Sequence, residues 1–231
     1  MFVDVDDTII EVHGYQKQGS GYGYSGVRGL NALLATASTE TAAPVILGQR
    51  LRRGAVGSPR GAGRMVGDVL ATLKRLRPGS DTRVLVRADA AFYGHPTVAA
   101  TLAAGADVSV TARMDKAVKA AIVTIDVTAW TGIEYPEAIY DETTGTWTSK
   151  AEVAEVPFTA FTSKKKAERI PGRLVVRRIP ELNPQDTDQP MLFGTHRFHA
   201  FFTTTDPEVL DTVTADHTHR GMRSSSRSTP T

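Results

Sequence analysis

The stretch FVDVDDTIIEV, residues 2–12, decides the fold. It is rich in β-branched residues and alternates well enough to form a β-strand. Successive side chains of a strand point to opposite faces, so Asp4, Asp6 and Thr8 share one face and Asp7 lies on the other. Two carboxylates on one face must be hydrated, paired or bound to metal, because together they would repel each other if buried. Oxygen ligands of this kind suit Mg²⁺ or Mn²⁺.

Two more strands are expected directly after this one. The segment Gly14–Gly26 holds five glycines and breaks the first strand. The segments Leu30–Ala37 and Val45–Leu51 then have the composition of strands, which predicts an antiparallel three-stranded meander. Apolar residues recur at helical spacing between Gly63 and Leu76, and this pattern predicts a helix.

The middle of the chain alternates between strands and helices. Arg83–Arg87 is a short apolar strand of the buried kind, and it delivers Asp89 to its carboxyl end. A helix is expected at Pro96–Ala104, a strand at Asp107–Ala112 and a second helix at Asp115–Val123. A three-stranded meander followed by such α/β units is the order of an RNase H-like core, an α/β fold with a mixed sheet.

From Trp130 to about Phe202 the sequence changes to aromatic residues, threonine and glycine turns, which predicts a β-rich insertion. Its expected strands are Ile133–Tyr140, Thr146–Ser149, Glu155–Phe161, Arg173–Ile179 and Arg197–Thr204, with an exposed loop at Asn183–Pro190. Pro207–His217 is expected to form the start of a final helix. The predicted division is therefore a core at 1–128, an insertion at 129–205, the start of the final core helix at 206–221 and an aberrant, disordered tail at 222–231.

Composition excludes several classes of protein. The chain has 231 residues with 41% hydrophobic content, enough for a real core. It contains no cysteine, so disulfides, thiolate zinc sites and cysteine nucleophiles are excluded. No apolar run approaches the ~18 residues of a membrane span, and no signal peptide precedes the first strand, so we expect a cytoplasmic protein.

The basic residues are clustered, although the formal net charge is only +2. The first cluster comprises Arg50, Arg52, Arg53, Arg60 and Arg64, and the second includes Lys164, Lys165, Lys166, Arg169, Arg173, Arg177 and Arg178. Such clusters neutralise phosphates along a DNA duplex, or they form a solvated basic face without a partner. The charges alone leave both readings open.

Four stretches together resemble the catalytic core of one group of bacterial insertion-sequence transposases of the Asp-Asp-Glu (DDE) type. They are VDVDDTIIEVHGYQKQG, GYSGVRGLNALLAT, LRRGAVGSPRGAGR and LVRADAAFYG, and the resemblance extends over nearly all of residues 1–221. It implies that the first metal-binding aspartate is Asp6 and the second is Asp89, with Asp4 as the substitute if the strand register differs by two. It also implies a β-rich insertion after the second aspartate, and a further region ahead of the first strand.

The tail fits no packed element as it stands. Residues 222–231, MRSSSRSTPT, contain one apolar side chain in ten. One permitted set of codons, shifted by one base, encodes His-Ala-Ile-Ile-Glu-Gln-Val-His-Ala-Asp. This is an amphipathic helix, and it resembles the glutamate-bearing helix that ends the transposase core. We therefore expect a transposase fragment, truncated at both ends and frameshifted after Gly221, in which the third carboxylate is lost.

The resemblance implies a mobile-element enzyme that cuts and joins double-stranded DNA at the terminal inverted repeats of an insertion sequence. Two Mg²⁺ or Mn²⁺ ions about 3.5–4 Å apart activate the attacking oxygen and stabilise the leaving oxygen in such enzymes. The intact family implies a possible homodimer, a nucleoid-associated location and no membrane partner. Without its glutamate one ion lacks a ligand, so we expect this chain to be inactive or nearly so.

Two other readings stay open. The Asp-x-Asp-x-Thr pattern at Asp4–Thr8 fits a haloacid-dehalogenase-like phosphatase, with Asp4 as nucleophile and Asp6 as general acid. That mechanism needs a late acidic pair near a strand end, and none is found in the sequence. The other reading is an inert DNA-binding remnant of a mobile element, which would bind duplex DNA in a salt-dependent way without cleaving it.

Overall fold

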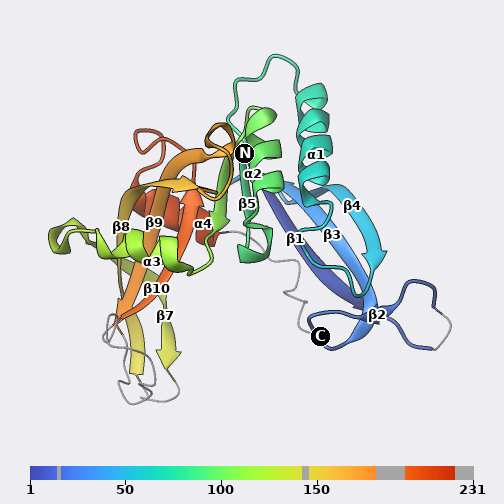
Figure 1. Ribbon diagram of the computed structural model, residues 1–231, viewed down its shortest axis with the longest axis horizontal. Coiled ribbons are helices and arrows are strands. Elements are labelled where there is room, and N and C mark those ends of the chain that lie inside the picture. Colours follow the sequence, from blue (N-terminus) through green and yellow to red (C-terminus); the bar gives the residue numbers. More distant parts are fainter. Residues whose placement is uncertain (15–16, 142–145, 181–195, 222–231) are drawn as a thin grey trace. The chain divides into compact units, whose positions relative to one another are not determined.

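The computed structural model describes residues 1–14, 17–141, 146–180 and 196–221 (Figure 1). The chain forms two compact units, Met1–Thr111 and Ala112–Arg220, and each is described by itself. These units are defined by contacts within the chain. The predicted boundaries at 128 and 205 instead separate a core from an insertion, so they remain predictions.

The first unit is built on a mixed sheet. Its strands are β1 (Phe2–Glu11), β2 (Gly21–Tyr22), β3 (Arg28–Ser38), β4 (Val45–Arg53), β5 (Leu85–Ala88) and β6 (Asp107–Thr111). Strand β3 is antiparallel to β1 on one side and to both β2 and β4 on the other. Strands β1, β5 and β6 lie next to one another and are parallel. The expected antiparallel meander followed by parallel strands is therefore present.

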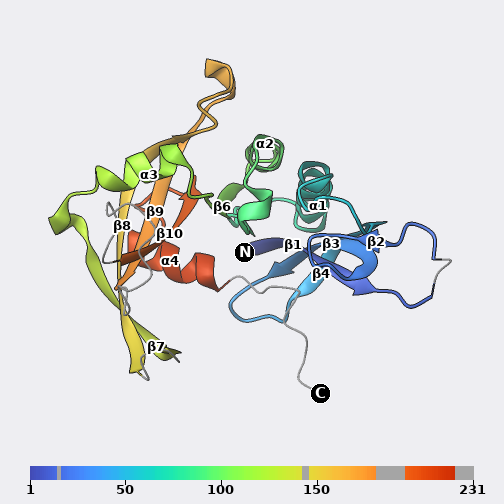
Figure 2. The same ribbon diagram turned by 60° about the horizontal axis from the view of Figure 1, so that its bottom comes forward.

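Two helices cover one face of this sheet (Figure 2). They are α1 (Ala62–Leu76) and α2 (His95–Ala103). The buried side of α1 is the apolar stripe that predicted it, Met65, Val66, Val69, Leu70 and Leu73. The helices approach closely at Gly63, where a Cβ atom would lie 2.5 Å from the carbonyl oxygen of Pro96. At Gly48 of β4 a Cβ atom would lie 2.8 Å from Val69, so α1 rests directly on the strand.

The second unit is an antiparallel sheet with helices. Its strands, in sheet order, are β10 (His196–Thr203), β9 (Ile170–Pro180), β8 (Thr146–Ala160) and β7 (Thr131–Asp141). Its α-helices are α3 (Lys116–Val123) and α4 (Thr212–Arg220), and short 3₁₀ turns lie at η2 (Val127–Ala129) and η3 (Lys166–Glu168). Leu174, Val175, Val176 and Phe202 are buried in its core. A β-rich second half was expected from the aromatic and threonine content.

Two expectations for this unit need correction. Strand β8 is continuous from Thr146 to Ala160, where two separate strands were predicted. The link between them continues the strand because Glu152, Val153 and Ala154 pair with β9 in unbroken register. Helix α4 begins at Thr212, five residues after the predicted start, because the Asp211 carboxylate accepts the Thr214 N–H and caps the helix there. The predicted loop Asn183–Pro190 and the tail 222–231 lie outside the described residues.

The helices of the described residues are short. None of them is long and apolar enough to cross a membrane.

Candidate active site

Asp6 and Asp89 lie directly after the last paired residues of two parallel strands. The β1–β5 pairing ends at Val5 opposite Ala88; Asp6 continues β1, whereas Asp89 is the first residue after β5. Adjacent strands lie about 4.8 Å apart, and the negative charge of Asp6 raises the pKa of the Asp89 carboxyl, so the two carboxylates are near each other. Both line a cavity of about 580 Å³ in the first unit. The structure thus brings together two residues that are distant in the sequence and that the sequence selected separately.

Each of these carboxylates is anchored by a peptide N–H. Asp6 Oδ1 accepts the N–H of Asp7 at 2.8 Å. Asp89 Oδ1 accepts the N–H of Ala91 at 2.9 Å, and this bond caps the 3₁₀ turn η1 (Ala90–Phe92) that follows β5. Burial raises the pKa of the Asp89 carboxyl; the Ala91 N–H lowers it, and the negative charges of Asp6 and Asp7 raise it again. A bound cation would offset both the burial and the repulsion.

Asp4 is not part of this cavity, although it shares a strand face with Asp6. Arg87 donates two hydrogen bonds to its carboxylate, from Nε at 2.6 Å and from Nη2 at 2.8 Å. The side chains of Asp4 and Arg87 are only 5% and 4% exposed, and the guanidinium also lies 4.3 Å from the centre of the Phe2 ring. The ion pair with Arg87 engages the Asp4 carboxylate. The phosphatase reading needs this carboxylate as its nucleophile, and the metal-site reading names it as a substitute ligand.

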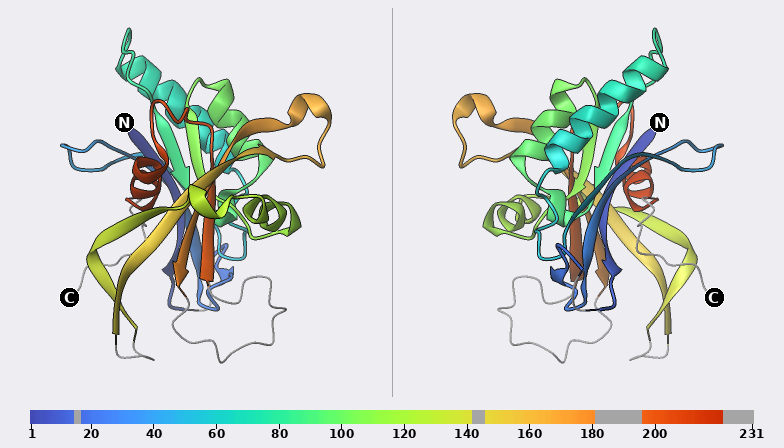
Figure 3. Two further views of the ribbon diagram at one scale, coloured as in Figure 1. Left: turned by 90° about the vertical axis from the view of Figure 1, so that its left-hand side faces the viewer. Right: turned by 90° about the vertical axis from the view of Figure 1, so that its right-hand side faces the viewer.

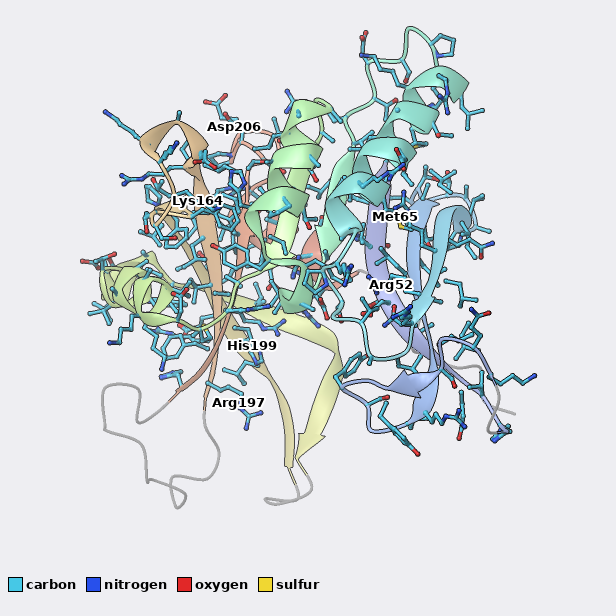
Figure 4. All side chains as sticks on the ribbon, turned by 45° about the vertical axis from the view of Figure 1, so that its right-hand side comes forward. Arg52, Met65, Lys164, Arg197, His199 and Asp206 are labelled. Carbon is cyan, nitrogen blue, oxygen red and sulfur yellow. The ribbon has the colours of Figure 1, made fainter. Side chains whose placement is uncertain are left out.

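A buried polar cluster supports the wall of the cavity, which Asp7 also lines. Asp7 accepts hydrogen bonds from Asn31 of β3 and from Arg52 of β4, which is labelled in Figure 4. Arg52 also donates to the carbonyl oxygens of Ser58 at 2.9 Å and of Arg60 at 2.6 Å. Ser58 lines the cavity, so Arg52 ties the loop between β4 and α1 to three strands. Sequence reasoning had placed Arg52 in a surface cluster and had not found this role.

Glycines allow the chain to close around the cavity. A Cβ atom on Gly54 would lie far inside contact distance of the carbonyl oxygens of Gly21 and Gly29, and one on Gly23 would lie 2.6 Å from the carbonyl oxygen of Gly54. The Gly54 N–H donates to the Gly19 carbonyl oxygen at 3.0 Å. The glycine-rich segment after β1 is therefore packed against the end of β4 by backbone contacts. The sequence showed its glycine content but not this packing.

The other predicted DNA-binding residues are mostly at the surface. Arg53, Arg60 and Arg64 are exposed in the first unit, and Arg50 pairs with Asp68 of α1 at 2.7 Å. In the second unit Lys164, Lys165 and Lys166 are exposed at the connection between β8 and β9. This connection, orange in Figure 3, extends beyond the strands that it joins.

The oxygen donors of the cavity fit a hard cation. Asp6 and Asp89 supply carboxylates from two strands, and Mg²⁺ is usually bound through one or two carboxylates with water completing its shell. Among the described residues no group of three or more acidic, histidine or cysteine side chains is arranged to hold a metal ion. The structure therefore places two carboxylates at the cavity, and their role as metal ligands remains a prediction.

The likenesses found for this chain are to solved structures. Neither protein-family models nor curated proteins match this chain. Among solved structures it is similar to a piggyBac transposase in a synaptic complex with hairpin DNA, with a TM-score of 0.46 and 10% identity. The alignment covers 96% of this chain, which spans 37% of that protein. A likeness at this level carries no argument about function.

Proposed function

We propose that this chain is the catalytic part of a DDE-type DNA transposase with an RNase H-like core, and that Asp6 and Asp89 bind a divalent cation beside a DNA phosphodiester. The observation that carries the proposal is the adjacent placement of Asp6 and Asp89 at one cavity. The sequence stretches that resemble insertion-sequence transposases surround the same cavity. The sheet order, a meander joined to parallel strands, agrees with an RNase H-like core.

In this proposal the side chains bind the cation, and backbone groups orient those side chains. Asp6 and Asp89 would hold Mg²⁺ or Mn²⁺, and the N–H groups of Asp7 and Ala91 fix the two carboxylates before any ion arrives. Bound cations of this type polarise phosphoryl oxygens and lower the pKa of bound water. Arg52 keeps the loop at Ser58 in place at the edge of the cavity.

The proposed partner is double-stranded DNA, bound at the terminal inverted repeats of an element. Exposed Arg53, Arg60 and Arg64 would contact phosphates in the first unit. Lys164, Lys165 and Lys166 would do so in the second. Arg52 is left out of this interface because its guanidinium is engaged in internal hydrogen bonds.

The sequence offers only two of the three carboxylates that the resemblance implies, and this favours a second candidate function. A chain that binds DNA and a cation without cleaving DNA is an inert remnant of a mobile element. The observation that favours it is the sequence MRSSSRSTPT at residues 222–231, which carries no glutamate where the resemblance implies one. DNA cleavage by this chain should therefore be weak or absent, and cation binding is the sharper measurement.

The experiment is a titration of the full chain with Mn²⁺. Binding is measured by calorimetry or from the electron paramagnetic resonance signal of the free ion. Asp6→Asn and Asp89→Asn should each weaken binding at least tenfold. Asp81→Asn makes the same charge change at an exposed site outside the cavity and should bind as the unmodified chain does. Unchanged binding in both cavity variants would refute the proposal.

A further inference from the structure

Two tyrosines with exposed rings line the same cavity as the two aspartates. Tyr22 is 69% exposed and Tyr24 is 74% exposed, yet both contribute to the walls of the cavity that holds Asp6 and Asp89. We infer that Tyr22 and Tyr24 are a stacking platform for unpaired nucleobases beside the phosphodiester bound at Asp6 and Asp89. This inference rests on the proposed function and assigns a binding role to two side chains of the glycine-rich segment after β1.

The backbone that carries these rings is held in place by hydrogen bonds and close packing. Tyr22 lies in β2 and pairs with Arg28 of β3, while the Gly26 N–H donates to the Gly23 carbonyl oxygen and closes the turn around Tyr24. The close contact between Gly23 and Gly54 leaves no room for side chains between this turn and the end of β4. An aromatic ring on a fixed backbone loses little conformational freedom when a ligand stacks on it.

The chemistry of the cavity favours a nucleobase as the occupant. A nucleic acid strand alternates phosphates, which need cations, with bases, which offer flat π-faces to aromatic rings. The cavity combines a pair of cation-binding carboxylates with two aromatic rings. A second cavity of about 350 Å³ shares Ala55 with it and is lined by Arg53, which can pair with the next phosphate of the strand.

Tyr24 is better suited to stacking than to nucleophilic attack. Burial raises the pKa of its phenol, and the negative charges of Asp7, Asp6 and Asp89 raise it further. The hydroxyl therefore stays protonated at neutral pH, and the ring carries no charge that would repel a phosphate. A phenolate, which attack on phosphorus requires, is disfavoured at this position.

The inference can be tested by DNA binding without metal. The full chain is titrated, in EDTA, with three labelled DNAs: a duplex with a short run of unpaired bases, the same DNA with abasic sites in that run, and a fully paired duplex. The unmodified chain should bind the unpaired bases most tightly. Tyr22→Ala and Tyr24→Ala should each lose about tenfold on that DNA alone, as expected for a lost base–aromatic stack.

Matched variants separate stacking from other causes. Tyr22→Phe and Tyr24→Phe keep the ring and should retain binding. Val27→Ala removes an exposed apolar side chain of the same segment that does not line the cavity, and it should have no effect. Thermal unfolding and the Mn²⁺ titration of each alanine variant should match those of the unmodified chain, which shows that the site is intact.

The outcomes distinguish this inference from the proposed function. If the unmodified chain prefers unpaired bases and the alanine variants bind them equally well, stacking by these tyrosines is refuted and the transposase proposal stands. Equal affinity of the unmodified chain for unpaired and abasic DNA also refutes stacking. If it binds none of the three DNAs at low salt, both proposals fail together.

Discussion

Arg87 and Asp4 form a bidentate ion pair between neighbouring parallel strands, with hydrogen bonds of 2.6 and 2.8 Å and almost no exposure to solvent. The pair explains why two aspartates on one face of β1 have different surroundings. The charge of Asp4 is compensated inside the protein, whereas Asp6, two residues further along, opens to the cavity.

Removing one partner of this pair should destabilise the protein strongly. Arg87→Met leaves the Asp4 carboxylate buried without its cation, and we expect a loss of about 3–5 kcal/mol in the free energy of unfolding. Adding Asp4→Leu to this variant removes the stranded charge and should recover much of the loss. Urea denaturation of the two variants measures both effects, and equal stability of the single and double variants would contradict this account.

The close backbone packing at Gly54 should not tolerate a side chain. Gly54→Ala forces the β2 segment away from β4, because its Cβ atom would overlap the carbonyl oxygens of Gly21 and Gly29. We expect a loss of about 1–3 kcal/mol. Gly67 of α1 is the control, since its Cβ atom would meet nothing within 4 Å and Gly67→Ala should stabilise the helix by about 0.5–1 kcal/mol.

The pH dependence of stability should carry a signature of Asp89. Its pKa is raised above the ordinary value of 3.8 by burial, so the folded protein holds this proton more tightly than the unfolded chain does. The stability that this contributes is complete below pH 3.8 and is lost as the pH rises through the folded-state value. Asp89→Asn should weaken the pH dependence of the melting temperature between pH 3.8 and the folded-state pKa of Asp89. Mg²⁺ should raise the melting temperature at neutral pH only when Asp89 is present. If the melting temperatures of the two proteins depend on pH in the same way, the pKa of the Asp89 carboxyl is not raised.

The exposed lysines between β8 and β9, Lys164, Lys165 and Lys166, form a basic tip whose charge should contribute to DNA affinity. Lys164→Ala together with Lys165→Ala should weaken duplex binding without regard to sequence and reduce the slope of log affinity against log salt by about two, near 0.9 per lost phosphate contact. Lys116→Ala with Lys119→Ala removes the same charge from exposed positions of α3 and serves as the control. A slope that is the same for both pairs would exclude a specific role for the tip.

The sequence predicted those features that follow from local pattern. The alternation in β1 and the helical spacing in α1 are strong, and both elements lie where they were expected. Asp89 was selected because it follows a short apolar strand, and the structure places it beside Asp6. Which element follows which could therefore be predicted with few errors.

The features that depend on register could not be predicted in this way. Arg52 contacts Asp7 and Asn31 only because β1, β3 and β4 are aligned in one particular register, and a shift by one residue would turn these side chains to opposite faces. Sequence alone showed Arg52 as one of several surface cations. The place of the two tyrosines at the cavity could not be predicted for the same reason, since it depends on contacts between glycines that are distant in the chain.

The turn that Asp89 caps has an implication for ligand affinity. A carboxylate that swings freely in water must give up that motion when it coordinates an ion, and the lost entropy weakens the complex. At Asp89 the bond from the Ala91 N–H has already removed this freedom during folding. Side-chain length is consequently critical at this position: a glutamate would carry the same charge on a longer arm and would surrender the rigidity that the turn provides.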